Sequence, residues 1–180
     1  MNTFDCITTR RSIRKFTDKK VTADALDKIV SLASYAPSWK NSQTTRYIAV
    51  LDPSLKTSLA NDCMMGFEYN VITASGAPTM VVVTTVNGRS GYERDGRATT
   101  SKGSHWQSFD AGIATQTFCL AAHELGLGTV IMGIFDENKV AELVGVPEGQ
   151  SVSALIAIGY PADEPQAPKR KSAEELLTVK

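Results

Sequence analysis

Residues 111–134 read AGIATQTFCLAAHELGLGTVIMGI, and this stretch does most to decide the fold. Its first half is small and apolar on nearly every face, which predicts a central, buried helix. Asp110 stands where it can cap that helix, and Gly126 and Gly128 supply a stop. Residues 129–134 then read as a strand, so a buried helix leads directly into the sheet.

The flanking sequence predicts further helices and strands in irregular order. We expect helices over 2–9, 23–35, 53–65 and 67–74 and one that starts at Asp136, with strands over 46–51, 79–86 and 152–158. Thr22 and the Asp52–Pro53 pair read as helix starts. Because helices and strands do not alternate regularly, the pattern favours an α+β fold over a doubly wound sheet.

Two stretches carry no core of their own. Residues 87–104 contain four glycines and six charged residues, which is typical of a functional lid or of a disordered loop. From Pro161 onward the chain is polar and rich in proline, and we expect this tail to lie along another surface.

Length and composition bound the class of protein. The 180 residues fit a single domain, 1–180, with a core of its own. Nineteen basic residues balance nineteen acidic ones, which argues against general nucleic-acid binding and against a polybasic membrane anchor. The sequence shows neither a secretory signal nor an apolar bilayer span, and its three cysteines lack metal or disulfide spacing. We therefore expect a cytoplasmic protein without a metal site.

The run Arg10-Arg11-Ser12-Ile13-Arg14 is the first candidate ligand site. In an extended segment Arg10, Ser12 and Arg14 point the same way, and two guanidiniums beside a hydroxyl suit an anion or a phosphate. The alternative is a solvated basic stretch. The tail run Lys169-Arg170-Lys171 poses the same choice.

The loop PSWKNSQ, residues 37–43, is the second candidate. It offers an amide, hydroxyls and an indole, which can hydrogen-bond the edge of a heterocycle while stacking on it. The alternative is ordinary turn chemistry, where Pro, Ser and Asn are common.

Several familiar catalytic motifs are absent. The chain has no dinucleotide-binding glycine fingerprint, no phosphate-binding GxxxxGK[ST] loop, no GxSxG elbow and no paired-carboxylate or Cys/His constellation. Polar recognition groups are plentiful, yet no side chain stands out as nucleophile or base. This combination indicates an enzyme whose bound cofactor supplies the reactivity.

Three segments in order resemble the FMN-dependent nitroreductases of the short type. They are ITTRRSIRKFTDKKV (7–21), APSWKNSQTTRYIAV (36–50) and LAAHELGLGTVIMGIFDENKVAELVGVPEGQSVSALIAIGYPADEP (120–165). The resemblance runs nearly end to end and is weakest over 87–108.

The resemblance implies an α+β fold with a central, mostly antiparallel sheet flanked by helices. It also implies an intertwined homodimer with FMN at the interface and a tail that reaches the partner. The implied cofactor-binding residues are Arg10, Arg11, Ser12, Arg14, Pro37, Ser38, Trp39, Asn41, Asn70, Ile131, Met132, Gly133, Lys169 and Arg170.

Each group of these residues has an implied role. Residues 10–14 and the tail pair Lys169–Arg170 hold the phosphate, with residues 10–14 also on the ribityl chain and pyrimidine edge. Residues 37–41 come from the partner chain, Asn70 lies near the isoalloxazine, and the backbone of 131–133 faces the reactive flavin nitrogen.

The implied activity is ping-pong hydride transfer from NADH or NADPH, through FMN, to nitroaromatics, quinones or similar acceptors. No side chain is assigned as catalytic, and positive charge on Arg14 is predicted to stabilise the reduced flavin. The alternatives are a flavin reductase, an enone reductase or a dehalogenase on the same scaffold, or a flavin-binding protein without turnover. The sequence predicts neither the physiological acceptor nor a preference for NADH or NADPH.

This chain departs from the family pattern at three positions. Trp39 stands where many relatives have Ser, Thr44 where many have Pro, and many have another residue at Met132. An indole at position 39 narrows the pocket or stacks on a substrate. Within 87–108, the side chains Tyr92, Lys102, His105 and Trp106 are candidates for a lid or substrate wall; the alternative is a mobile surface loop.

Overall fold

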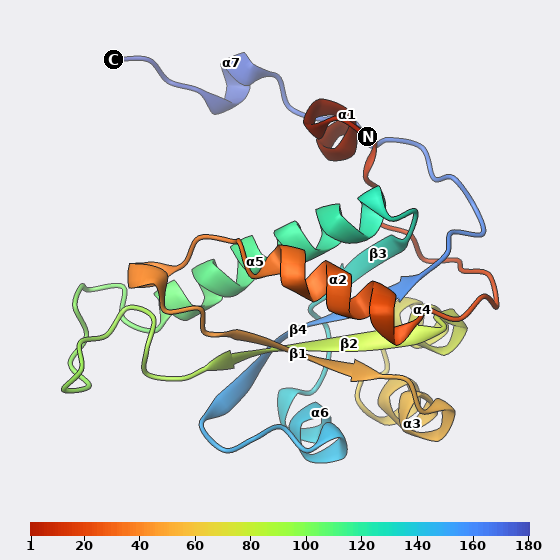
Figure 1. Cartoon of the computed structure of the whole chain (residues 1–180), viewed down its shortest axis with the longest axis horizontal. Helices are drawn as coiled ribbons and strands as arrows, with labels where there is room; N and C mark the ends of the chain where they lie inside the picture. Colours follow the sequence, from red (N-terminus) through yellow and green to blue (C-terminus); the bar gives the residue numbers. More distant parts are fainter.

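A four-stranded antiparallel sheet forms the centre of the protein, whose residues 1–180 are all described by a computed structural model (Figure 1). The strands are β1 (Thr45–Val50), β2 (Thr79–Val86), β3 (Gly128–Met132) and β4 (Gln150–Gly159), in the order β1-β2-β4-β3. Every neighbouring pair is antiparallel. The expected α+β class is therefore confirmed, and β3 lies at an edge of the sheet.

Helices cover both faces of this sheet (Figure 1). On one face lie α2 (Ala23–Ala33) and α5 (His105–Glu124); on the other lie α3 (Pro53–Asp62), α4 (Glu68–Gly76) and α6 (Glu137–Val144). Strand β2 feeds both layers, because successive side chains alternate: Val81 and Val83 pack with α2 and α5, Met80 and Val82 with the other three helices. The prediction that 79–86 is a strand buried on both faces is confirmed.

Three of the helix starts read from the sequence are confirmed. The side chain of Thr22 accepts a hydrogen bond from the Ala25 amide, Asp52 accepts from the Leu55 amide, and Asp136 accepts from two amides of α6. Gly126 ends α5 in the left-handed region, at φ 76°, and the Leu127 amide returns to the Ala122 carbonyl at 2.9 Å.

The predicted start of the central helix was wrong. Helix α5 begins at His105, six residues before the expected start, and Asp110 lies within it rather than capping it. Asp110 is only 3% exposed. Its Oδ2 accepts one hydrogen bond from the Trp39 amide, at 2.9 Å, and one from the Ser90 hydroxyl, at 2.6 Å. Because these partners are 71 and 20 residues away, no local pattern reveals this role for the carboxylate.

Other boundaries differ by a few residues. The first helix is α1 (Thr3–Thr9), α2 ends two residues before position 35, and α3 ends three residues before position 65. Strand β3 ends at Met132 rather than at position 134, whereas β4 is longer than 152–158 at both ends.

Residues 87–104 form an ordered turn structure, and the helix that follows already includes 105–108. The Glu93 amide donates to the Arg97 carbonyl and the Thr99 amide to the Gly91 carbonyl, both at 2.9 Å. Gly91 sits at φ +83° against the start of α5, where a Cβ would lie 2.3 Å from the Gly103 carbonyl oxygen.

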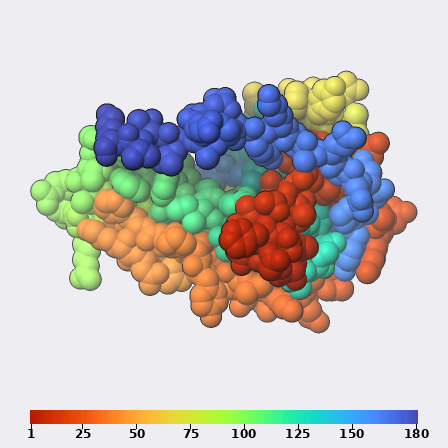
Figure 2. Space-filling model, turned by 90° about the horizontal axis from the view of Figure 1, so that it is seen from above, coloured from red at the N-terminus to blue at the C-terminus, as the bar shows by residue number.

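The C-terminal tail, 161–180, is exposed along its whole length. It contains the short helix α7 (Ala173–Leu176), which begins with a capping box between Ser172 and Glu175. The tail (blue) runs along the same side of the molecule as α1 (red) in Figure 2. None of the helices combines the length and the apolar character needed to cross a bilayer.

Candidate functional site

Four of the predicted cofactor-binding residues line one cavity, of about 440 Å³. They come from three separate elements: Arg14 from the segment after α1, Asn70 from the first turn of α4, and Ile131 and Met132 from β3. The Asn70 amide nitrogen donates to the Ile134 carbonyl at 3.0 Å, which fixes the side chain against the end of β3. Three segments far apart in the sequence therefore meet at one site.

The segment that carries Arg14 is attached to the edge of the sheet. The Ile13 amide donates to the Thr129 carbonyl at 3.0 Å, and Ser12 forms a parallel bridge with Thr129. The side chain of Ile13 is buried against Gly128, where any Cβ would clash with it. The predicted alternation is thus observed at Ile13, whose neighbours Ser12 and Arg14 are more exposed.

Backbone groups of β3 also face this cavity edge. Thr129 uses its outer carbonyl for the Ile13 amide, and N–H and C=O groups repeat their direction every second residue. The N–H of Ile131 therefore points toward the same outer edge, beyond the point where the 12–13 segment covers it. Its side chain is 47% exposed and also lines a second cavity, of about 450 Å³, between α5 and β4.

Arg10 and Arg11 line a different cavity from Arg14. That cavity, of about 580 Å³, also includes His123 and Asp163. The Arg11 guanidinium donates to the Thr8 carbonyl at 2.7 Å and to the Arg10 carbonyl at 2.8 Å. Burial, and then the charge of Arg10, lowers the pKa of His123, so this ring is neutral near pH 7.

Lys169 and Arg170 lie in the exposed tail and form no ion pair within the chain. The exposed Gly133 follows β3 directly. The predicted convergence of Arg10, Arg11, Arg14 and the tail pair on one phosphate stays a prediction.

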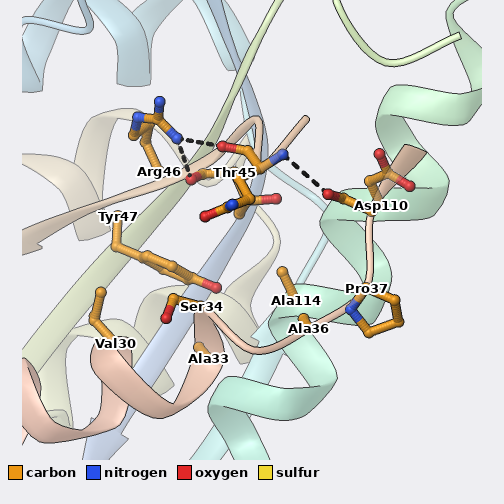
Figure 3. A pocket seen from close by; sticks show the side chains of 12 residues that line it. Val30, Ala33, Ser34, Ala36, Pro37, Thr45, Arg46, Tyr47, Asp110 and Ala114 are labelled. Carbon is orange, nitrogen blue, oxygen red and sulfur yellow. Dashed lines mark hydrogen bonds between the residues drawn. The ribbon is translucent and has the colours of Figure 1, made fainter. Parts of the chain in front are cut away.

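The Pro37–Asn41 residues lie away from the Arg14 cavity. Pro37 and Ser38 line a cavity of about 330 Å³ between α2, β1 and α5 (Figure 3), while Trp39 and Asn41 line a cleft of about 700 Å³. One chain thus holds two groups of predicted site residues in separate places.

The loop that carries these residues, 38–43 (the Trp39 loop), has an unusual backbone. Lys40, Asn41 and Gln43 all have positive φ, at 46°, 52° and 47°. Such conformations cost non-glycine residues about 1–2 kcal/mol each. The Ser38 hydroxyl accepts from the Gln43 amide at 2.9 Å, and the Trp39 amide binds Asp110. Strain of this kind persists only where surrounding contacts hold it, and it clusters at functional sites.

Sequence reasoning missed two features of these sites. Phe67 and Tyr69 contribute a tilted aromatic pair to the Arg14 cavity, with ring centroids 5.8 Å apart. Asp110 fixes the Trp39 loop; its only signal was a carboxylate in a helix that is otherwise small and apolar. Trp106, a candidate for the lid or substrate wall, lies beside the Trp39 loop: the centroids of the Trp106 and Trp39 rings are 4.7 Å apart.

The titratable groups provide no obvious nucleophile. Burial raises the pKa of the Cys63 and Cys119 thiols, which keeps both protonated near pH 7. No three His, Cys, Asp or Glu side chains are grouped as metal ligands. The site offers recognition groups and an apolar surface, as an enzyme with an organic cofactor does.

The sequence profile of the Nitroreductase family matches residues 7–160. The chain belongs to the nitroreductase family. This match confirms the resemblance drawn from the three motifs, and it makes the protein a member of a family of oxidoreductases.

Individual members of the nitroreductase family agree with this assignment. An Archaeoglobus fulgidus protein assigned as an NADH dehydrogenase or NAD(P)H nitroreductase is 30% identical over 162 residues, which cover 88% of this chain and 84% of its own. The crystal structure of a nitroreductase family protein from Clostridium novyi superposes with a TM-score of 0.78 at 29% identity, covering 93% and 89% of the two chains. The NADPH:FMN oxidoreductase from Vibrio harveyi, solved with NAD⁺, gives 0.82 at 26% identity, covering 99% and 77%.

Proposed function

We propose that this nitroreductase family member binds FMN and uses NADH or NADPH to reduce nitroaromatics, quinones or similar acceptors. The observation that carries the proposal is the cavity where Arg14, Asn70 and Ile131 meet beside the free edge of β3. A flavin reductase, an enone reductase and a dehalogenase use the same chemistry, and acceptor screening distinguishes them.

The residues of this cavity fit a flavin. An isoalloxazine needs an apolar surface beneath its ring and hydrogen-bond donors at its pyrimidine edge. Ile131 supplies an exposed apolar side chain, Arg14 a guanidinium, and Asn70 an amide with one N–H and its oxygen still free. The backbone N–H of Ile131 supplies a further donor at the edge of β3. Arg10 and Arg11 are cations on the same segment for the phosphate.

When bound, FMN supplies the hydride chemistry. The chain's own residues would bind and orient it: Arg14 would place positive charge at the pyrimidine edge, and Asn70 holds the segment that follows β3 in position through Ile134. Phe67 and Tyr69 line one side of the cavity with aromatic rings, which offer a flat apolar surface to a ring system.

The proposal includes a homodimer in which Pro37, Ser38, Trp39 and Asn41 serve the partner's flavin. Two observations support it. These residues do not line the Arg14 cavity of their own chain, and their loop holds a strained backbone of the kind that clusters at functional sites.

The first test is reconstitution of the purified protein with FMN. We expect stoichiometric FMN binding, followed by loss of the flavin absorbance on anaerobic addition of NADH or NADPH, and its return on addition of a quinone or nitroaromatic. Arg14→Ala is expected to bind FMN at least about tenfold more weakly, while Arg97→Ala, at a residue that does not line the cavity, serves as the charge-matched control. Protein that takes up no FMN contradicts the proposal, and protein that binds FMN without reduction is a flavin-binding protein.

A further inference from the structure

The Trp39 loop and the 87–104 segment enclose a cleft that the family's cofactor does not account for within this chain. The cleft has a volume of about 700 Å³, large enough for a drug-sized ligand. One wall is Trp39, Lys40 and Asn41; the other is part of the 87–104 segment, including Arg89, Tyr92 and Arg94.

The lining of this cleft is positively charged. Lys40, Arg89 and Arg94 are basic, and Glu93 is the only acidic residue. Lys40 Nζ donates to both oxygens of Glu93, at 2.9 and 3.1 Å. The bond from Lys40, with one from the Thr99 hydroxyl, lowers the pKa of Glu93, so this carboxylate is ionised and paired.

Arg89 and Arg94 are left without partners. Neither guanidinium forms a hydrogen bond or an ion pair in the structure. Arg97, three residues further along the same segment, differs: its guanidinium lies 3.5 Å from the Asp95 carboxylate, and it does not line the cleft. The two arginines of the cleft therefore keep their donors for another molecule.

Both walls of the cleft are fixed to the body of the protein. Asp110 Oδ2 accepts hydrogen bonds from the Trp39 amide on one wall and from the Ser90 hydroxyl in the segment that forms the other. The Trp106 indole of α5 donates to the Thr100 hydroxyl at 3.0 Å, which attaches the 87–104 segment to this helix. The arginines thus project from an ordered frame, which reduces the entropy lost when they bind a ligand.

We propose that this cleft binds an oxyanion, a phosphate or a carboxylate, of a substrate that reaches the flavin. Guanidinium groups match both kinds of oxyanion with paired donors. The inference rests on the proposed function, because Trp39 and Asn41, which line the cleft, are the residues proposed to meet the partner's flavin. The oxyanion has two sources: the pyrophosphate of the nicotinamide reductant or the carboxylate of an acceptor.

The first experiment measures anion binding without turnover. The chain contains only two tryptophans: Trp39 lines the cleft, and the ring of Trp106 lies tilted against it with the centroids 4.7 Å apart, so intrinsic fluorescence reports on the cleft. We expect titration with inorganic pyrophosphate, at constant ionic strength, to change this fluorescence saturably. The double variant Arg89→Ala/Arg94→Ala should weaken binding at least about tenfold, as expected for lost charge-assisted hydrogen bonds.

The matched control is Arg97→Ala, which removes one positive charge from the same segment. We expect the single variant Arg94→Ala to weaken pyrophosphate binding and Arg97→Ala to leave it unchanged. Equal weakening in both variants, or no saturable fluorescence change in the parent protein, overturns the proposal. Because this titration needs no flavin, its failure is separate from failure of the FMN-binding test.

The second experiment identifies the source of the oxyanion. If the reductant supplies it, Arg94→Ala raises the KM for NADH and NADPH and leaves the KM for all acceptors unchanged. If the acceptor supplies it, the variant raises the KM for nitrobenzoate but not for nitrobenzene, with the reductant KM unchanged. Unchanged KM values for every substrate, beside intact flavin binding, overturn the assignment of the cleft to the flavin reaction.

Discussion

Tyr47 carries a hydroxyl that is buried without a hydrogen-bond partner. Its ring stacks on Phe118 at 5.2 Å, and Figure 3 shows the hydroxyl directed across the cavity between α2 and α5. Burial raises the pKa of this phenol to about 12. A buried polar atom without a partner costs about 1–3 kcal/mol, so this hydroxyl lowers the stability of the isolated chain.

We therefore expect Tyr47→Phe to stabilise the protein, by about 1 kcal/mol near pH 7, in denaturant unfolding. The pH dependence adds a second signature. The pKa of Tyr47 is higher in the folded than in the unfolded chain, so the unfolded chain loses this proton first as the pH rises. The free energy of unfolding is therefore unaffected by this titration below about pH 10 and falls as the pH rises toward 12. Tyr47→Phe should flatten the loss of stability between about pH 10 and 12. Tyr35→Phe, at an 85% exposed position, is the control and should change neither.

Arg14 offers a prediction about the flavin itself. In the proposed site, its positive charge would lie near the pyrimidine edge and would stabilise the reduced, anionic ring more than the oxidised one. We expect Arg14→Ala to lower the two-electron reduction potential of bound FMN, by roughly 30 mV for each 1.4 kcal/mol of lost stabilisation. A potentiometric titration at saturating FMN measures this, and Arg14→Lys, which keeps the charge, should recover part of it. A potential that does not fall in Arg14→Ala assigns the residue to binding alone.

At the scale of elements, Asp110 joins three parts of the chain: α5, the Trp39 loop and the 87–104 segment. Hydrogen bonds to a charged group contribute about 1.5–3 kcal/mol each. We expect Asp110→Ala to speed amide exchange in both 38–43 and 88–92 and to destabilise the protein by at least about 2 kcal/mol. Ser90→Ala removes only one of the two bonds, and should loosen 88–92 while leaving 38–43 protected. Equal effects of the two variants contradict this role of the carboxylate.

The sequence predicted an element correctly where the signal came from residues close together in the chain. The apolar row of β2 and the caps at Thr22, Asp52 and Asp136 depend on neighbours in sequence, and the structure confirms them. The start of α5 was wrong because Asp110 resembles a cap locally, whereas its partners Trp39 and Ser90 come from distant segments. The turn structure of 87–104 depends on the same long-range contacts and on the close approach at Gly91.

The candidate site was predicted only in part. Arg14, Asn70 and Ile131 were named through the family resemblance, and the fold brings them to one cavity. Phe67 and Tyr69 were missed, because two exposed aromatics at the start of a short helix give no sequence signal. Lys169 and Arg170 form no ion pair within the chain, and their role at the phosphate stays a prediction.

At the scale of the whole molecule, the site is proposed to take residues from two chains. Arg14→Ala and Asn41→Ala should each impair activity, because one chain supplies Arg14 and the other supplies Asn41 to each proposed site. In a mixed dimer of the two variants, one site carries both substitutions and the other carries neither. Random exchange of subunits makes half of the dimers mixed, so we expect about a quarter of the parent activity to return. No recovery after mixing by co-refolding contradicts a shared site, and a monomeric, active flavoprotein on dilution does so directly.

The two bonds at Asp110 also constrain how this enzyme can be altered. Acceptor range in such a scaffold is an obvious target for exchanging surface loops between relatives. Here the 87–104 segment and the Trp39 loop are both hydrogen-bonded to Asp110 Oδ2, and the ring of Trp39 lies tilted against that of Trp106 in α5, with the centroids 4.7 Å apart. A chimera that imports only one of them puts one of the two hydrogen bonds to this buried carboxylate at risk. The two segments and Asp110 should therefore be exchanged together.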